Sequence, residues 1–289
     1  DLRPQRASVT EVETWIRDPY AIFARRILRL EALDGLGTTL DASDRGMFVH
    51  AVLERFVREG HSFRAADAEA RLAAIAEEVL AAHDAFPEVQ ALWRPRLAAI
   101  GRWWIAEEAK REAVIAERAA EVGGRLEIEI DGLPFTLTGI ADRIDLLADG
   151  TVAVLDYKTG QPPSEKMVQS LLSPQLALEA AMVEAGGFDH KGAGPFADKT
   201  VSEAAYLHLK GGRDGGVWAK RGVAEDEARS IAELGAAAIE ELAKLVRLYR
   251  LATTGYPSRP RVQFEAARTG PYDHLARVAE WAAGEGGEA

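Results

Sequence analysis

The stretch of sequence that decides the fold runs from residue 139 to residue 158 and reads GIADRIDLLADGTVAVLDYK. Apolar side chains recur on both sides of Ala148-Asp149-Gly150, a tripeptide with the residue types of a tight turn. The pattern therefore predicts two antiparallel strands, over residues 140–147 and 151–157, joined as a hairpin.

The length of the turn decides which residue of the first strand faces Asp156. A two-residue turn at Asp149-Gly150 would pair Asp156 with Arg143, whereas a three-residue loop with a left-handed Gly150 pairs it with Asp142. Burial favours the register that gathers apolar side chains on one face. The three-residue loop gathers five of them: Ile140, Ile144, Leu146, Val152 and Val154. We therefore expect Asp142 to lie opposite Asp156.

Asp142, Asp156 and Lys158 then share one face, because side chains two residues apart on a strand project together. Two carboxylates offer the oxygen ligands that Mg²⁺ takes together with water and substrate phosphate. The metal would acidify a bound water, which Lys158 would orient or deprotonate while it stabilises the developing negative charge. A buried salt bridge is the competing interpretation, and the hairpin alone leaves both open. Asp145 would point the other way, beside Arg143, and is the second choice as a ligand.

Outward from the hairpin, the spacing of apolar residues predicts a mixed α/β chain. Ser8 and Glu11 form a capping-box pattern that opens a helix, and Asp131-Gly132 marks a turn between two strands. The order of elements predicts a mixed sheet with helices packed around it. Further helices are expected at residues 20–28, 43–59, 64–83, 90–120, 164–170, 173–185, 225–251 and 273–281, and strands at 125–130, 134–142, 140–147, 151–157 and 202–209. Residues 211–216 are expected to form a surface hairpin.

The composition is that of a folded protein with one large domain or two small ones. Its 289 residues are 47% apolar, which excludes a disordered chain. Cysteine is absent, which removes disulfides, thiol nucleophiles and cysteine-ligated zinc or iron–sulfur clusters. No apolar run reaches about 18 residues and no signal peptide is recognisable, so we expect a soluble, cytoplasmic protein without a membrane partner.

The charge of the chain does not decide its partner. A formal net charge of -11 argues at first sight against nucleic acid. The acidic excess, however, lies largely in the helices expected between residues 64 and 121. Arginines crowd residues 3–29, and a second basic stretch covers residues 244–268. Solvated helix faces are the alternative interpretation of either basic stretch.

The motifs around the hairpin resemble a known family. Gly139-x-x-Asp142 followed by Asp156-Tyr-Lys158-Thr-Gly160 is similar to the RecB-type branch of the PD-(D/E)XK nuclease superfamily. Gly46-x-x-x-His50 and Gln175-Leu176 resemble the histidine and glutamine motifs of that branch. Residues 8–23 and 272–277 resemble the C-terminal nuclease domain of bacterial AddB, which processes double-strand breaks with AddA. The resemblance spans most of the chain, and its motifs occur in the family's order.

The resemblance implies a restriction-endonuclease-like core and a metal-dependent DNA nuclease, exonucleolytic on single strands, that acts in double-strand break repair and recombination. The metal, Mg²⁺ or Mn²⁺, would be bound by four groups: the side chains of His50, Asp142 and Asp156 and the backbone carbonyl of Tyr157. Lys158 would assist the attacking water.

The same resemblance implies the surroundings of the site. Gln175 and Thr159 would lie on the DNA side, and an AddA-like helicase–nuclease subunit would be the protein partner. The chain would form a single nuclease domain over residues 1–289. Its parts would be mainly helical at 1–121, a catalytic sheet core at 122–210 and helical at 211–289.

Two departures from the family pattern matter. Many AddB proteins hold an iron–sulfur cluster with flanking cysteines; here Asp18 stands at the first such position and no cysteine exists. The N- and C-terminal segments must then be held together by packing alone. The glutamine motif usually ends in tyrosine, whereas this chain has Glu179, which puts the DNA contact of that helix in doubt.

Other interpretations are weaker but stay open. A nuclease-like fold that has lost activity could serve as a DNA-binding or subunit-docking module, and a structural domain could hold the same residues as a salt bridge. Lys158-Thr159-Gly160 also matches a motif of penicillin-binding enzymes, but the partner serine motif is missing. The chain contains no HExxH motif, so a zinc peptidase is not expected. It has neither a GxSxG elbow nor a phosphate loop, so it carries no motor of its own.

Overall fold

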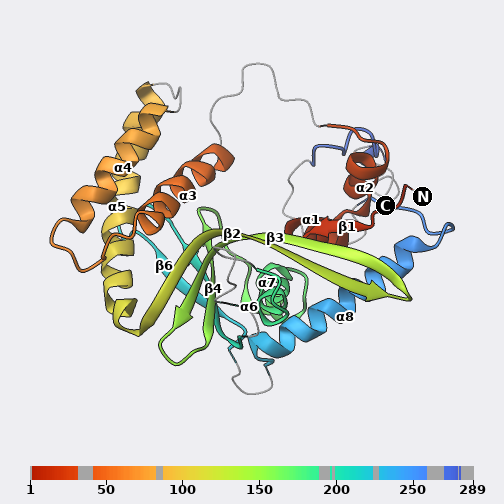
Figure 1. Cartoon of the computed structure of the whole chain (residues 1–289). Coiled ribbons are helices and arrows are strands. Elements are labelled where there is room, and N and C mark those ends of the chain that lie inside the picture. The colour runs from red at the N-terminus through yellow and green to blue at the C-terminus, as the bar shows by residue number, and fades with distance from the viewer. Residues whose placement is uncertain are drawn as a thin grey trace, which may run out of the picture.

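A computed structural model describes residues 2–31, 42–82, 87–188, 196, 199–223, 228–258, 270–278 and 280. Its centre is a mixed sheet of six strands in the order β1-β3-β4-β5-β6, with β2 paired to β3 (Figure 1). The pairs β1–β3 and β4–β5 are parallel, and the other pairs are antiparallel. The strands are β1 (Arg6–Ser8), β2 (Ile115–Ile130), β3 (Leu133–Leu147), β4 (Val152–Lys158), β5 (Val201–His208) and β6 (Val217–Arg221). The predicted mixed α/β fold is thus confirmed.

Helices cover both faces of this sheet. On one face, α1 (Val9–Arg17), α7 (Gln175–Glu184) and α8 (Ile231–Arg250) share a hydrophobic core with Val152 and Val154 of β4. On the other face, α3 (Ala42–Arg58), α4 (Ala68–Ala82) and α5 (Pro87–Arg111) share a second core with Ala153 and Leu155. β4 is therefore buried on both sides, as its apolar run requires. No helix in the described part of the chain is long and apolar enough to span a membrane.

The register of the β3–β4 hairpin is the predicted one. Gly150 has φ +87°, its N–H donates to Leu147 O at 2.9 Å, and Ile144 pairs with Val154. This is the three-residue loop, and it aligns Asp142 with Asp156. One expected member of the apolar face is wrong: Ile140 is 62% exposed. It lies beyond the last β3–β4 pair, where the two strands have separated.

The helix expected over residues 90–120 is wrong beyond Arg111. After the short 3-10 turn η2 (Glu112–Val114), the chain enters β2 and pairs along β3 as far as Leu147. Figure 1 shows this long β2–β3 hairpin crossing the molecule, with α3, α4 and α5 at one end and α1, α2 and α8 towards the other. Residues 115–121 are rich in Ala and Glu and locally favour a helix, but strand pairing in the tertiary structure overrides that preference.

The N-terminal elements follow the predicted capping pattern. The Ser8 side chain accepts from Glu11 N at 3.1 Å, and the Glu11 carboxylate accepts from Ser8 N at 2.9 Å. Beyond α1, α2 (Pro19–Ile22) continues into a π-helical segment, η1 (Phe23–Ile27). The helix expected over residues 164–170 is α6 (Glu165–Gln169). The helix expected at residues 225–251 begins later, at Ile231, and residues 271–277 form turns rather than a helix. Strands β1 and β6 were not expected.

Aromatic packing and hydrogen bonds join the N-terminal segment to the segment after α8. Phe23 contacts Tyr256 with ring centroids 5.6 Å apart, and Tyr256 contacts Tyr249 at 4.7 Å. The Arg3 guanidinium donates to the backbone oxygens of Tyr249 and Thr254 at 2.5 and 3.2 Å. These contacts join the two segments without any cysteine, as the sequence requires.

Candidate metal centre and active site

The site forms where β3 and β4 separate. Their backbone pairing ends at Arg143 and Leu155. Beyond this pair, the Tyr157 N–H of β4 no longer meets a backbone acceptor on β3. The Tyr157 N–H donates instead to Asp142 Oδ2 at 2.7 Å. The carboxylate thus replaces a backbone acceptor, which satisfies a buried donor and fixes the Asp142 side chain.

His50 reaches this point from α3. Its Nε2 lies 2.8 Å from Tyr157 O and its Nδ1 lies 3.5 Å from Asp142 Oδ2. Because a carbonyl oxygen only accepts, Nε2 carries a proton and Nδ1 is the nitrogen available to a metal. Burial lowers the pKa of His50, but the hydrogen bond and negative charge of Asp142 outweigh burial, so the net pKa is raised.

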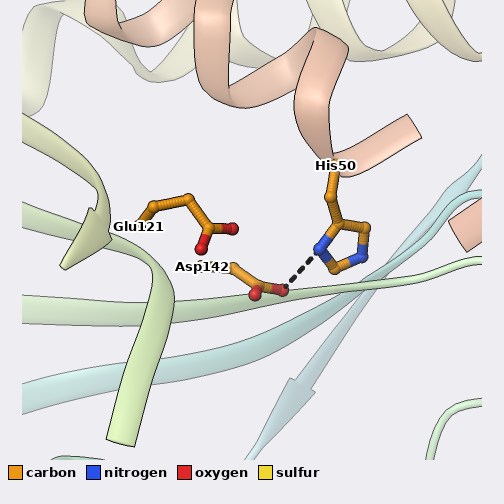
Figure 2. Close-up of side chains that lie close together, drawn as sticks. All are labelled: His50, Glu121 and Asp142. Carbon is orange, nitrogen blue, oxygen red and sulfur yellow. Dashed lines mark ion pairs between the residues drawn. The ribbon is translucent and has the colours of Figure 1, made fainter. Parts of the chain in front are cut away.

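Glu121 completes a group of three possible ligands. Figure 2 shows its carboxylate facing Asp142 and His50 from the neighbouring strand. One ligand atom from each of the three residues lies within 4.8 Å of the others. Ala120 pairs with Arg143 and Val122 with Ala141, so Glu121 stands across from Asp142. Burial raises the pKa of Glu121, and the charge of Asp142 raises it further.

Three acidic residues therefore form one row across three strands. Glu121 on β2, Asp142 on β3 and Asp156 on β4 occupy aligned positions. Glu121 was not expected as a ligand, because it lies just beyond the end of the helix expected over residues 90–120. The signal that could have revealed it is the continuation of the β2–β3 pairing beyond Arg125, which aligns an acid with Asp142.

Asp156 and Lys158 form the second half of the site. Lys158 Nζ lies 2.9 Å from each oxygen of Asp156, which is only 2% exposed. Burial raises the pKa of Asp156 to about 6 against the lowering effect of Lys158. Burial lowers the pKa of Lys158, but Asp156 outweighs burial and raises it overall. Lys158 is therefore an ammonium ion suited to stabilising negative charge.

Gln175 lies inside this site. Its Oε1 accepts from Lys158 at 3.1 Å, and its Nε2 donates to Asp156 at 2.5 Å and to Glu179 at 3.1 Å. Glu179 is 1% exposed, and burial followed by the charges of Asp156 and Asp142 raises its pKa well above the usual range. The Glu179 carboxyl is thus an acceptor that orients the Gln175 amide.

Two other residues from the sequence analysis lie apart from this centre. Thr159 packs beside Gly46 at the start of α3 and lines a small separate pocket with Arg45 and Trp93. Asp145 accepts two hydrogen bonds from Arg143 at 2.8 Å, and both side chains are fully buried. Arg143 also donates to Glu108 at 2.7 Å, so Asp145 belongs to a structural ion network.

The donor set fits a divalent cation. Carboxylates are the ligands that Mg²⁺ and Mn²⁺ prefer, and imidazole joins them in transition-metal sites. A ligating histidine commonly donates its second ring N–H to a backbone carbonyl, as His50 does to Tyr157. The raised pKa values of Glu121 and Asp156 reflect burial beside other carboxylates, and a cation would reverse that repulsion.

A groove opens beside this centre. Lys158 and Gln175 form part of its wall, and the other described lining residues come from α1, Asp18, α2, η1, residues 29–31, Pro163 and residues 270–272. Its volume is about 950 Å³. The reactive face of Lys158 is therefore accessible to a substrate.

Comparison with known proteins identifies the family. Residues 6–266 match the model of the PD-(D/E)XK nuclease superfamily. Uncharacterized proteins of Rickettsia typhi and Rickettsia bellii are each 32% identical, over 73% and 64% of this chain. The chain spans only 24% and 22% of their lengths. The crystal structure of SSO0001 aligns with a TM-score of 0.30 and 15% identity over 86% of this chain and 88% of that one, too low to support any inference. The chain belongs to the PD-(D/E)XK nuclease superfamily.

Proposed function

We propose that this domain is a DNA nuclease that hydrolyses phosphodiester bonds with the help of Mg²⁺ or Mn²⁺. The observation that carries the proposal is the row Glu121, Asp142 and Asp156 on three adjacent strands, with His50 at one side and Lys158 at the other. A row of carboxylates where two strands separate costs stability unless a cation compensates it. Catalysis accounts for that cost, whereas a purely structural role does not.

Each residue has a role in this proposal. The side chains of His50, Asp142, Glu121 and Asp156 would hold the metal, which when bound would polarise phosphate and acidify water. The Tyr157 carbonyl accepts from His50 Nε2, so it would join the metal only if that hydrogen bond opened. The Lys158 ammonium, held between Asp156 and Gln175, would stabilise the negative charge that develops on the phosphate. The pKa of Lys158 is raised, so its side chain is positively charged and can stabilise negative charge on the phosphate.

The wider role of the protein is also a proposal. The motifs that resemble AddB suggest the nuclease domain of an AddB-like subunit that acts with an AddA-like partner in double-strand break repair and recombination. The relatives are about three times as long as this chain, because 215 and 186 aligned residues make up 24% and 22% of them, which is consistent with a domain of a larger protein. Residues 1–289 would then form one nuclease domain, with Thr159 near the DNA.

The test is metal-dependent cleavage of end-labelled single-stranded DNA by the wild-type domain and by Lys158→Ala. We expect cleavage that requires Mg²⁺ or Mn²⁺ and falls at least about 100-fold in the variant, a typical loss for a charge-stabilising group. Lys166→Ala is the matched control, because Lys166 is an exposed lysine on the neighbouring helix α6.

The metal site is tested separately by thermal unfolding with and without the metal. A shift that is lost in Asp142→Asn, without any cleavage by the wild type, would indicate a formed site that needs its partner subunit. Neither cleavage nor a metal-dependent shift would refute the catalytic proposal and favour a docking module.

A further inference from the structure

The groove beside Lys158 is lined by arginines from one of the two basic stretches. Its wall includes Arg17, Arg25 and Arg29, together with the hydroxyl groups of Thr10 and Thr14. The acidic residues Glu13, Asp18 and Glu31 also line it. Glu13 is compensated within the wall, because Arg17 lies 2.8 Å from its carboxylate.

Three of the six N-terminal arginines donate hydrogen bonds within the protein. Arg3 donates to backbone oxygens after α8, and Arg17 donates to Ser173 Oγ at 2.6 Å. Arg26 forms a bidentate pair with Glu11 at 2.8 and 2.5 Å. Arg25 lies 3.8 Å from the same carboxylate, and its side chain is 62% exposed. Glu11 therefore lies close to two arginines and carries only one negative charge. Arg26 makes the shorter contacts with it, so the charge of Arg25 is only partly neutralised.

Arg25 and Arg29 also lie on irregular backbone. Arg25 belongs to the π-helical segment η1, and Arg29 follows that segment with φ +56°. The turn is closed by Leu30 N, which donates to Ala24 O at 3.0 Å. Single π turns occur often at functional sites, and a left-handed arginine costs free energy that the fold must offset. The irregular turn places both exposed arginines at the groove.

The described part of the second basic stretch, residues 244–258, does not supply this wall. Its described cations pair elsewhere: Lys244 with Glu241 at 2.7 Å and Arg247 with Asp131 at 3.0 Å. Arg250 donates to the backbone oxygen of Ile130 at 2.6 Å. These residues serve as matched controls, because they carry the same charge on a different surface.

We propose that this groove guides a single DNA strand to Lys158, with Arg25 and Arg29 binding successive phosphates; the inference rests on the proposed nuclease function. A volume of about 950 Å³ is that of a small-ligand pocket, which suits a few nucleotides of one strand but not a duplex. Among the lining residues that the structure describes, Tyr272 is the only aromatic one; it is 7% exposed, and its hydroxyl donates to Leu30 O. The groove therefore reads backbone charge rather than base identity.

The experiment measures binding separately from cleavage. Fluorescence anisotropy with a labelled thymidine strand of about 12 nucleotides would be recorded in the Lys158→Ala background, where the strand stays intact. Each lost phosphate contact lowers the salt slope of log K by about 0.7, so Arg25→Ala with Arg29→Ala should lower it by about 1.4. At about 0.1 M salt this corresponds to roughly 25-fold weaker binding.

Control variants distinguish the loss of charge in the groove from misfolding, and failure of the groove proposal from failure of the nuclease proposal. The double variant Lys244→Ala with Arg247→Ala should bind with unchanged affinity and slope. Arg29→Gly removes the charge and also the strain of a left-handed arginine, so this variant should fold normally. Its salt slope should still fall by about 0.7, which is half of the fall expected for the double variant. An unchanged affinity and slope in the Arg25 and Arg29 variants would overturn the groove proposal, even if the wild type cleaves DNA. An equal loss of binding to a blunt duplex would overturn the single-strand assignment.

Discussion

Replacement of Glu121 tests the site most directly. In Glu121→Ala one of three clustered ligand groups is lost, while His50 and Asp142 keep their own hydrogen bonds. Even groups that only support metal ligands contribute about 10–100-fold to affinity, so the loss of a ligand should reach at least about 100-fold. A saturating metal would then stabilise the variant by about 2.7 kcal/mol less than the wild type.

The assay is thermal unfolding with excess Mn²⁺ and with a chelator. For a domain of this size, about 2.7 kcal/mol corresponds to a metal-dependent rise in Tm that is smaller by about 5–10 °C. Glu129→Ala is the matched control, because Glu129 is an exposed acid on the same strand, paired with Pro134 far from the site.

The metal-free protein gives an independent second readout. Glu121 has φ +50° and lies across from Asp142, so it adds both backbone strain and charge repulsion. Glu121→Gly removes both and should raise the metal-free stability by about 1 kcal/mol while it loses the metal response. If Glu121→Ala keeps the full metal-dependent shift and Asp142→Ala loses it, Glu121 is not a ligand and the row of acids has another role.

Three further predictions follow from the same geometry. Glu179→Ala should lower kcat about 10-fold, because the Gln175 amide loses the acceptor that orients it. Glu179→Gln keeps an acceptor oxygen, so its kcat should stay near that of the wild type. Equal losses of kcat in the two variants would contradict the positioning role. The pKa of Asp156 is raised to about 6, above its unfolded value, so its stabilising contribution is complete below about pH 4 and is lost as the pH rises through 6. The metal-free protein should therefore lose stability over that range in chelator, and Asp156→Asn should flatten the profile. Phe23 is only half-buried, so Phe23→Ala should destabilise the domain by about 1.5 kcal/mol in chemical denaturation through lost packing on Tyr256; a change below about 0.5 kcal/mol would show that the terminal segments are held otherwise.

Sequence alone predicted the elements whose causes are local. The capping box at Ser8, the three-residue loop at Gly150 and the register that aligns Asp142 with Asp156 all follow from turn chemistry and from burial of alternating apolar residues. The mixed α/β class followed from the same periodicities. Local geometry and one-sided burial act over a few residues, so these features can be read without the rest of the chain.

Tertiary structure decided the features that depend on distant partners. Residues 115–121 have helical composition but form β2, because pairing with β3 contributes more than their weak local preference. That pairing is what brings Glu121 to Asp142. His50, Gln175 and Glu179 lie on helices on opposite faces of the sheet, and only packing against β4 sets their distances. Which arginines remain exposed was likewise decided by contacts across the fold, since charge in a sequence does not show which partner neutralises it.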